Sequence, residues 1–318
     1  MPSVFKPLTW SFNWIKGRYF EPPQQPCALV ACTRTQSRWQ RFSSSASGTF
    51  LQGSFYCRPQ CLEAALVGRL ARLQDVAPSA LPPNRIPLGL LMVARGKLTH
   101  LEVRAALEAQ RRARYGKIGD WIEKLGFATE HEVTSALALQ WGCPVTRSIA
   151  PSTVSSIGGS PGNIPLSILE AFQMLPLNYA TSTNTLYVAC GERVDHAALY
   201  AIEKVLGCRT QPCVFSRKNI ARQLESMRQL PRPSDAEFGP MSELAEMASI
   251  AASYTARLNP DQVRLSRIGR FIWLRLDVRS KTRAHTTNLV FRLATDVRPI
   301  PFTRPFLDLQ TATTPRST

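Results

Sequence analysis

Two stretches of the chain repeat one pattern of apolar and polar positions, thirty residues apart. Residues 88–110 and 118–140 are identical at eight of 23 aligned positions, and both carry apolar side chains at helical spacing. In each copy a glycine stands where a first helix should end, and a Thr-x-x-Glu capping box follows where a second helix should begin. The pattern predicts two helix–turn–helix units that bury their apolar faces against each other as a small helical bundle.

Alternation of apolar and polar residues predicts strands after these repeats. Two alternating segments flank a polar turn at 181–184, as is typical of a hairpin. The predicted order is strand 175–180, strand 185–189, helix 195–206, strand 209–215 and a helix that begins at Ser216. These elements make a small α/β subdomain.

The C-terminal part has a pattern of its own. A helix is expected over 241–258, and three alternating segments follow as strands at 263–268, 271–278 and 288–293. Six arginines are expected on one outward face of this sheet: Arg264, Arg267, Arg270, Arg275, Arg279 and Arg292. A solvated face is the ordinary interpretation, and a docking surface for an acidic partner or a phosphate backbone is the functional one.

The fold class that these elements predict is α+β and multi-domain, with tandem helix–turn–helix repeats, a small α/β subdomain and a C-terminal helix-plus-antiparallel-sheet module. Prolines concentrate at 22–26, 78–87 and 231–240, which indicates linkers. The expected organisation is a flexible leader at 1–26, a treble-clef zinc-ribbon-like segment at 27–75, a Pro-rich linker at 76–87, the tandem-repeat helical part at 88–145, a linker at 146–163, the α/β subdomain at 164–229, a Pro-rich linker at 230–240, the C-terminal α+β module at 241–295 and a disordered tail at 296–318.

Four cysteines form two closely spaced pairs near the N-terminus, Cys27 with Cys32 and Cys57 with Cys61. Structural zinc takes four ligands in a tetrahedron, often from two such pairs. Residues 48–57 are typical of a hairpin that leads into the second pair, and a helix follows. The pattern predicts a Zn2+ site, and the alternative is four unliganded thiols in a disordered leader. The remaining cysteines stand singly in apolar surroundings and are expected to be small buried side chains: Cys143, Cys190, Cys208 and Cys213.

The two repeats also agree in the spacing of eight motif positions. In the first copy these are Pro87, Leu88, Gly89, Met92, Gly96, Val103, Leu107 and Gln110, and in the second Lys117, Ile118, Gly119, Ile122, Gly126, Val133, Leu137 and Gln140. With this spacing the chain resembles the N-terminal domain of type II secretion system protein E, the GspE/PilB family of secretion and type IV pilus assembly ATPases, in its MshE-type form with two tandem motifs. The resemblance covers 88–145 and, more loosely, 164–229.

The resemblance implies an interaction role. In the family this domain couples the motor to other components of the assembly platform, and the MshE type senses cyclic di-GMP at the motif positions. An arginine opens each family motif and is expected to meet the ligand phosphates, whereas here Pro87 and Lys117 stand in those places. Proline offers neither charge nor donor, and lysine lacks the planar fork of arginine. We therefore expect weak or lost cyclic di-GMP binding.

Catalysis is not expected. The motor of the family has a Gly-x-x-x-x-Gly-Lys-Ser/Thr loop, and the nearest approach here, at 89–97, has six residues between its glycines and Leu98 in place of the hydroxyl. The four histidines are dispersed, and no pair of carboxylates stands out. The sequence thus predicts a non-catalytic adaptor or regulator without the ATPase domain.

The net charge of +17, from 39 basic and 22 acidic residues, is spread along the chain and belongs to no recognised nucleic-acid module. No apolar run approaches the roughly 20 residues of a membrane-spanning helix, and the start has no secretory signal pattern. We expect a cytoplasmic protein whose partners are protein components of secretion or pilus assembly machinery. The alternative function is a zinc-ribbon-containing nucleic-acid-binding regulator that uses the arginine-rich sheet face.

Overall fold

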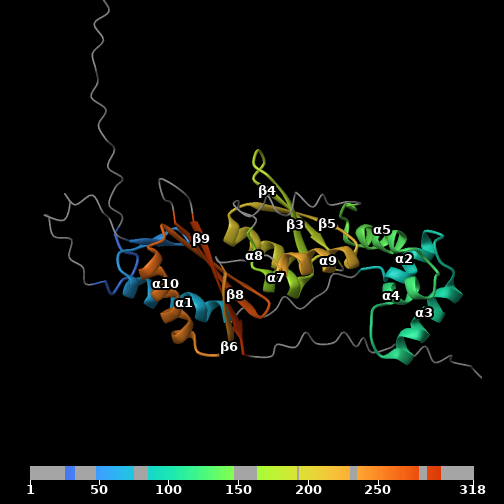
Figure 1. Cartoon of the computed structure of the whole chain (residues 1–318), viewed down its shortest axis with the longest axis horizontal. Coiled ribbons are helices and arrows are strands. Elements are labelled where there is room, and N and C mark those ends of the chain that lie inside the picture. The colour runs from blue at the N-terminus through green and yellow to red at the C-terminus, as the bar shows by residue number, and fades with distance from the viewer. Residues whose placement is uncertain are drawn as a thin grey trace, which may run out of the picture.

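The computed structural model describes residues 26–32, 48–74, 85–146, 163–191, 193–229, 235–278 and 285–294. The predicted leader before residue 26, the predicted tail, parts of all three predicted linkers and Arg279 lie outside these residues. Helices combined with two mixed sheets confirm the α+β fold class (Figure 1).

The tandem repeats fold as four helices, as predicted. They are α2 (Leu88–Ala94), α3 (His100–Ala113), α4 (Ile118–Lys124) and α5 (Glu130–Trp141). Thr99 and Thr129 form both capping boxes, and Gly96 and Gly126 end the first helix of each repeat with φ of 65° and 73°. Because α2 packs against α5 and α3 against α4, each repeat completes the core of the other.

The glycine near the start of each motif is required by close packing. A Cβ added at Gly89 would lie 2.9 Å from Val103 Cγ1, and one added at Gly119 would lie 3.0 Å from Val133 Cγ1. We expect Gly89→Ala to lower the free energy of unfolding by about 1–3 kcal/mol through overpacking. Gly68→Ala is the matched control, since nothing lies within 4 Å of its added Cβ. Urea unfolding of both variants measures the difference, and equal stability of the two would contradict this packing role.

The α/β subdomain follows the predicted order of strands and helices and adds one helix that was not predicted, α7 (Leu166–Phe172). Its elements are α7, β3 (Met174–Ala180), β4 (Thr185–Cys190), α8 (His196–Leu206), β5 (Arg209–Val214) and α9 (Arg217–Arg228). The sheet order is β3-β4-β5, with β4 antiparallel to β3 and parallel to β5. Residues 144–146, which follow the repeats, pair with Val214 and so connect the helical bundle to this sheet.

A six-stranded sheet joins residues 49–56 to strands between residues 235 and 293. Its strands are β1 (Thr49–Leu51), β2 (Ser54–Tyr56), β6 (Asp235–Met241), β7 (Gln262–Ile268), β8 (Phe271–Val278) and β9 (His285–Leu293), in the order β2-β1-β7-β8-β9-β6. The predicted hairpin near the cysteines thus lies beside the predicted C-terminal strands, with β1 parallel to β7. Residues 235–241 form the edge strand β6, although 230–240 was predicted as a linker and Met241 as the start of a helix, and Pro240 lies at a register shift of this strand.

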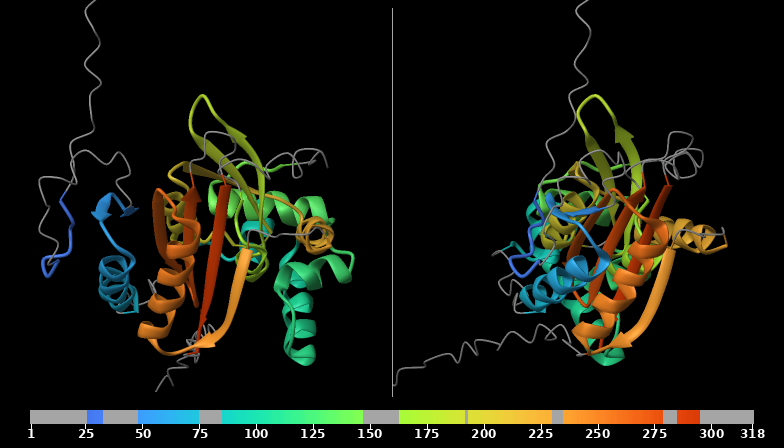
Figure 2. Two further views of the ribbon diagram at one scale, coloured as in Figure 1. Left: turned by 60° about the vertical axis from the view of Figure 1, so that its left-hand side comes forward. Right: turned by 90° about the vertical axis from the view of Figure 1, so that its left-hand side faces the viewer.

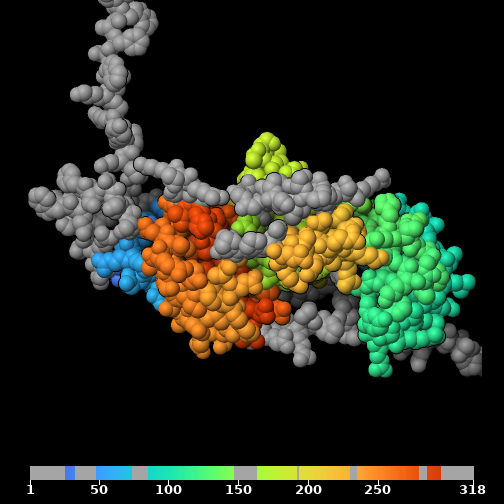
Figure 3. All heavy atoms as spheres, in the orientation of Figure 1, coloured from blue at the N-terminus to red at the C-terminus, as the bar shows by residue number. Residues whose placement is uncertain are grey.

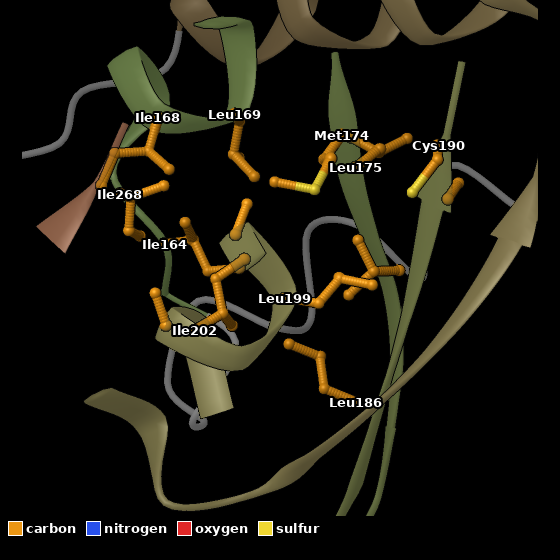
Figure 4. Close-up of a cluster of buried hydrophobic side chains, with 14 of the residues drawn as sticks. Ile164, Ile168, Leu169, Met174, Leu175, Leu186, Cys190, Leu199, Ile202 and Ile268 are labelled. Atoms are coloured by element: carbon orange, nitrogen blue, oxygen red, sulfur yellow. The ribbon is translucent and has the colours of Figure 1, made fainter. Parts of the chain in front are cut away.

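Helices cover both faces of this sheet. On one face α1 (Pro59–Gln74) and α10 (Leu244–Leu258) pack against Val263, Leu274 and Phe291 (Figure 2). On the other face Ile268 lies among side chains of the α/β subdomain such as Ile164 and Ile202 (Figure 4). The α/β subdomain and the C-terminal sheet therefore share one core.

The prediction of a single basic face on this sheet is wrong. Arg264 lies on the α8 side and donates to the carbonyls of Val205 and Leu206 at 3.1 and 2.8 Å. Its cross-strand neighbour Arg275 is 7% exposed, and Arg267 lies on the opposite face. The physical reason is that side chains alternate between the two faces of a strand, so positions 264 and 267, three residues apart in β7, cannot share a face.

Candidate functional sites

The four N-terminal cysteines come together in one cluster. Cys57 follows β2, and Cys61 lies in the first turn of α1. The backbone N–H of Ala28 donates to the carbonyl of Phe55 at 2.8 Å, and this bond holds the Cys27–Cys32 segment beside β2. The four sulfur atoms all lie within 4.8 Å of one another.

The spacing of the sulfurs matches a tetrahedral metal site. Cys32 Sγ is 3.6 Å from Cys57 Sγ and 3.8 Å from Cys61 Sγ. A zinc–sulfur bond of about 2.3 Å places the corners of a tetrahedron about 3.8 Å apart. Burial and the neighbouring thiols raise the pKa of Cys57, and they raise that of Cys61 to about 12. Four thiolates this close together would repel one another, and a bound cation would stabilise them. Four sulfur ligands are a donor set that fits Zn2+.

A second candidate site is a hollow of about 420 Å³ beside the second repeat. Half of the predicted nucleotide-binding positions line it: Leu88, Gln110, Lys117, Ile118, Gly119, Val133, Leu137 and Gln140. The structure does not bring the other half to this hollow: Pro87, Gly89, Met92, Gly96, Val103, Leu107, Ile122 and Gly126. Of these, Met92 and Ile122 are fully buried in the bundle core, and Val103 packs against Gly89.

The hollow also contains charged residues that the motif does not include. Three of them are acidic, Asp120, Glu123 and Glu130, and two are basic, Arg217 and Lys218 from α9. The sequence does not indicate that Arg217 and Lys218 belong here, because α9 lies about ninety residues further along the chain, and the three acidic residues belong to the second repeat but not to the eight motif positions. The only local signal was the run of basic residues in the first turn of that helix.

These charges pair with one another. Arg217 lies 3.1 Å from Asp120, and Lys218 lies 2.9 Å from Glu123 and 3.9 Å from Glu130. Ser216 donates a hydrogen bond to Glu130. Burial, followed by the nearby Arg217, lowers the pKa of Lys117. The hollow thus holds acidic and basic groups in balance, which does not favour a dianionic ligand.

The glutamines that close the two motifs bind backbone. Gln110 Nε2 donates to the carbonyl of Gly116 at 2.9 Å, and Gln140 Nε2 donates to that of Ile86 at 2.7 Å. Arg85 stacks 3.3 Å over the Trp141 ring and donates to the carbonyl of Gln140. Arg85 therefore connects the segment before α2 to the end of α5.

The remaining cysteines behave largely as predicted. Cys190, Cys208 and Cys213 are buried, and Cys143 is half-buried. Burial raises the pKa of Cys190 to about 12. Within the part of the chain that the structure describes, no other group of three or more His, Cys, Asp or Glu side chains is close enough to share a metal. None of the helices in that part is long and apolar enough to cross a membrane.

Comparison with known proteins finds distant structural similarity. No protein-family model and no curated protein sequence matches the chain. The solved structure of MshE with cdg is 22% identical, covers 45% of this chain and 99% of its own, and has a TM-score of 0.36. The N-terminal domain of XpsE is 17% identical, covers 43% of this chain and 91% of its own, and has a TM-score of 0.31. A second crystal form of that domain is 18% identical, with coverages of 42% and 89% and a TM-score of 0.25.

Proposed function

We propose that this protein is a non-catalytic adaptor that acts through its tandem-repeat bundle. The supporting observation is where apolar surface is exposed. Eleven large apolar side chains are exposed among the described residues, and seven of them lie between positions 86 and 139: Ile86, Leu90, Leu101, Leu107, Tyr115, Leu125 and Leu139. Concentrated apolar exposure marks interaction surfaces. The charged groups of the hollow, by contrast, are engaged with one another and offer no poised acid or base.

The proposed setting is secretion or type IV pilus assembly machinery. The eight-position spacing that both repeats share with the GspE/PilB N-terminal domain supports it. Co-purification of the tagged chain from its source cells, followed by mass spectrometry, is the test. We expect components of such machinery to be enriched over a tagged control protein and to persist after nuclease treatment. Recovery of nucleic acid alone would instead support the alternative regulator.

The nucleic-acid-binding alternative lacks the single basic sheet face that it would use. Arg264 and Arg267 lie on opposite faces of the sheet, and helices cover both. Phosphate binding would weaken steeply with salt concentration, so a salt-dependent gel shift remains its direct test.

We further propose that the cysteine cluster holds one structural Zn2+ and that cyclic di-GMP binding is weak or lost. The sulfur spacing supports the zinc site. Metal analysis of freshly purified, reduced protein should find about one equivalent, and none would contradict it. Pro87, the engaged Arg85 and the balanced charges of the hollow support weak binding of the dinucleotide.

A further inference from the structure

The two repeats are equivalent in structure but differ in what they contact. In the second repeat Asp120, Glu123 and Glu130 hold the first turn of α9 through the ion pairs and the hydrogen bond described above. The same hollow is lined by Thr134 and Leu137. This part of the second repeat is therefore a surface that receives the start of a helix.

The first repeat has the matching surface with different chemistry. Thirty residues earlier, the equivalent positions are Leu90, Val93, His100, Arg104 and Leu107, which we call the first-repeat face. Leu90 is 51% exposed and Leu107 37%, and His100 and Arg104 are exposed as well. None of the three carboxylates is kept, so a basic helix start such as that of α9 would find no partner here. Figure 1 shows α3 at the end of the molecule farthest from β1 and β2.

The first repeat carries a net positive charge, whereas the second repeat carries a net negative charge. Residues 87–114 contain six basic and two acidic side chains, whereas residues 117–144 contain two basic and four acidic ones. Both acidic groups of the first repeat are engaged, Glu102 in its capping box and Glu108 with Arg112 at 3.6 Å. In the space-filling view the repeats form one end of the molecule (Figure 3). An apolar face with a basic surround favours a ligand with apolar and acidic side chains.

We propose that the first-repeat face binds an acidic amphipathic helix of a partner protein. A helix is inferred because the equivalent face of the second repeat receives one, and a surface between two helices accepts the apolar side of a third. Carboxylates are inferred from the basic surround, and leucine-like side chains from Leu90, Val93 and Leu107. This inference rests on the proposed adaptor function and specifies the chemistry of its partner.

The test is fluorescence anisotropy with two synthetic helical peptides. They share one pattern of leucines, with glutamates on the polar side of one and lysines on that of the other. The full chain is expected to bind the glutamate peptide at least tenfold more tightly. Leu90→Glu and Arg104→Glu should each weaken that binding at least tenfold. Tyr187→Glu, at a side chain 39% exposed on β4, and Arg209→Glu, on β5, are matched controls outside the bundle that should leave it unchanged. Thermal unfolding of every variant checks that the fold is kept.

Several outcomes would overturn the proposal. Equal binding of both peptides, binding of neither, or equal effects of face and control variants would each do so. A wild-type chain that sediments as a dimer, together with a monomeric Leu90→Glu variant, would show that a second copy occupies the face instead. The adaptor function itself would stand in all these cases if secretion or pilus components still co-purify.

Discussion

Replacing Cys61 by serine should lower the midpoint of thermal unfolding by about 10 °C. Zinc binding by four cysteines contributes on the order of 10–16 kcal/mol in small zinc-binding peptides, and loss of one ligand should remove roughly a third of that. About 3–5 kcal/mol converts to this shift at about 2–4 °C per kcal/mol for a chain of this order of size. Differential scanning fluorimetry of reduced protein, with and without a chelator, measures it.

The loss should extend well beyond the N-terminal segment. The sequence alone predicts that serine at Cys57 or Cys61 loosens only the leader, because the tandem repeats have a core of their own. In the structure both cysteines belong to the core that contains Leu51, Leu62 and Val263, and β1 pairs with β7. Hydrogen exchange should therefore increase over 48–74 and also in β7. Exchange that increases only at 26–32 would contradict this wider role.

Cys208→Ser is the matched control for this prediction. Cys208 is buried at 6% exposure and lies outside the cluster. The serine should lower stability through lost packing, but the control protein should keep its metal and should still be destabilised by the chelator. The zinc site would be refuted if Cys61→Ser and Cys208→Ser responded to the chelator in the same way.

Local signals explain which parts of the fold could be predicted. The repeats have capping boxes, turn glycines and helical periodicity within thirty residues, and their four helices form as expected. The hairpin of β7 and β8 was equally clear, because its register depends on neighbouring residues. Each of these elements is specified by residues that are close together in the sequence.

Contacts between distant segments explain the rest. Leu51 pairs with Val263, more than two hundred residues later, and no local pattern indicates such a partner. The hollow is likewise completed by Arg217 and Lys218, which belong to another subdomain. In β7 the expected single basic face neglected the alternation of side chains, and no local pattern indicated that helices cover both faces of the sheet. The sequence therefore predicts which residues belong to the candidate sites, but it predicts only some of the distant residues that pack around them.

Placing arginine at both positions that open the repeat motifs, 87 and 117, should strengthen binding of cyclic di-GMP. One bidentate arginine–phosphate contact contributes on the order of 1.5–3 kcal/mol, or roughly ten- to a hundredfold in affinity. The double variant Pro87→Arg with Lys117→Arg should thus bind at least about a hundredfold more tightly than the wild type. Both positions accept arginine. Their φ values of −54° and −104° are negative, and neither position requires the left-handed backbone that favours glycine.

Titration calorimetry with the full chain can separate an arginine effect from a backbone effect. Lys117→Arg alone should gain about tenfold through the planar fork. Pro87→Ala removes the proline without adding a guanidinium, and it should gain nothing. If the wild-type chain already bound the dinucleotide with a sub-micromolar dissociation constant, the proposed weak binding would be wrong, and Lys117 would have to serve the phosphates as it stands. If Pro87→Ala gained as much as Pro87→Arg, the rigid proline and not the missing charge would be what limits binding.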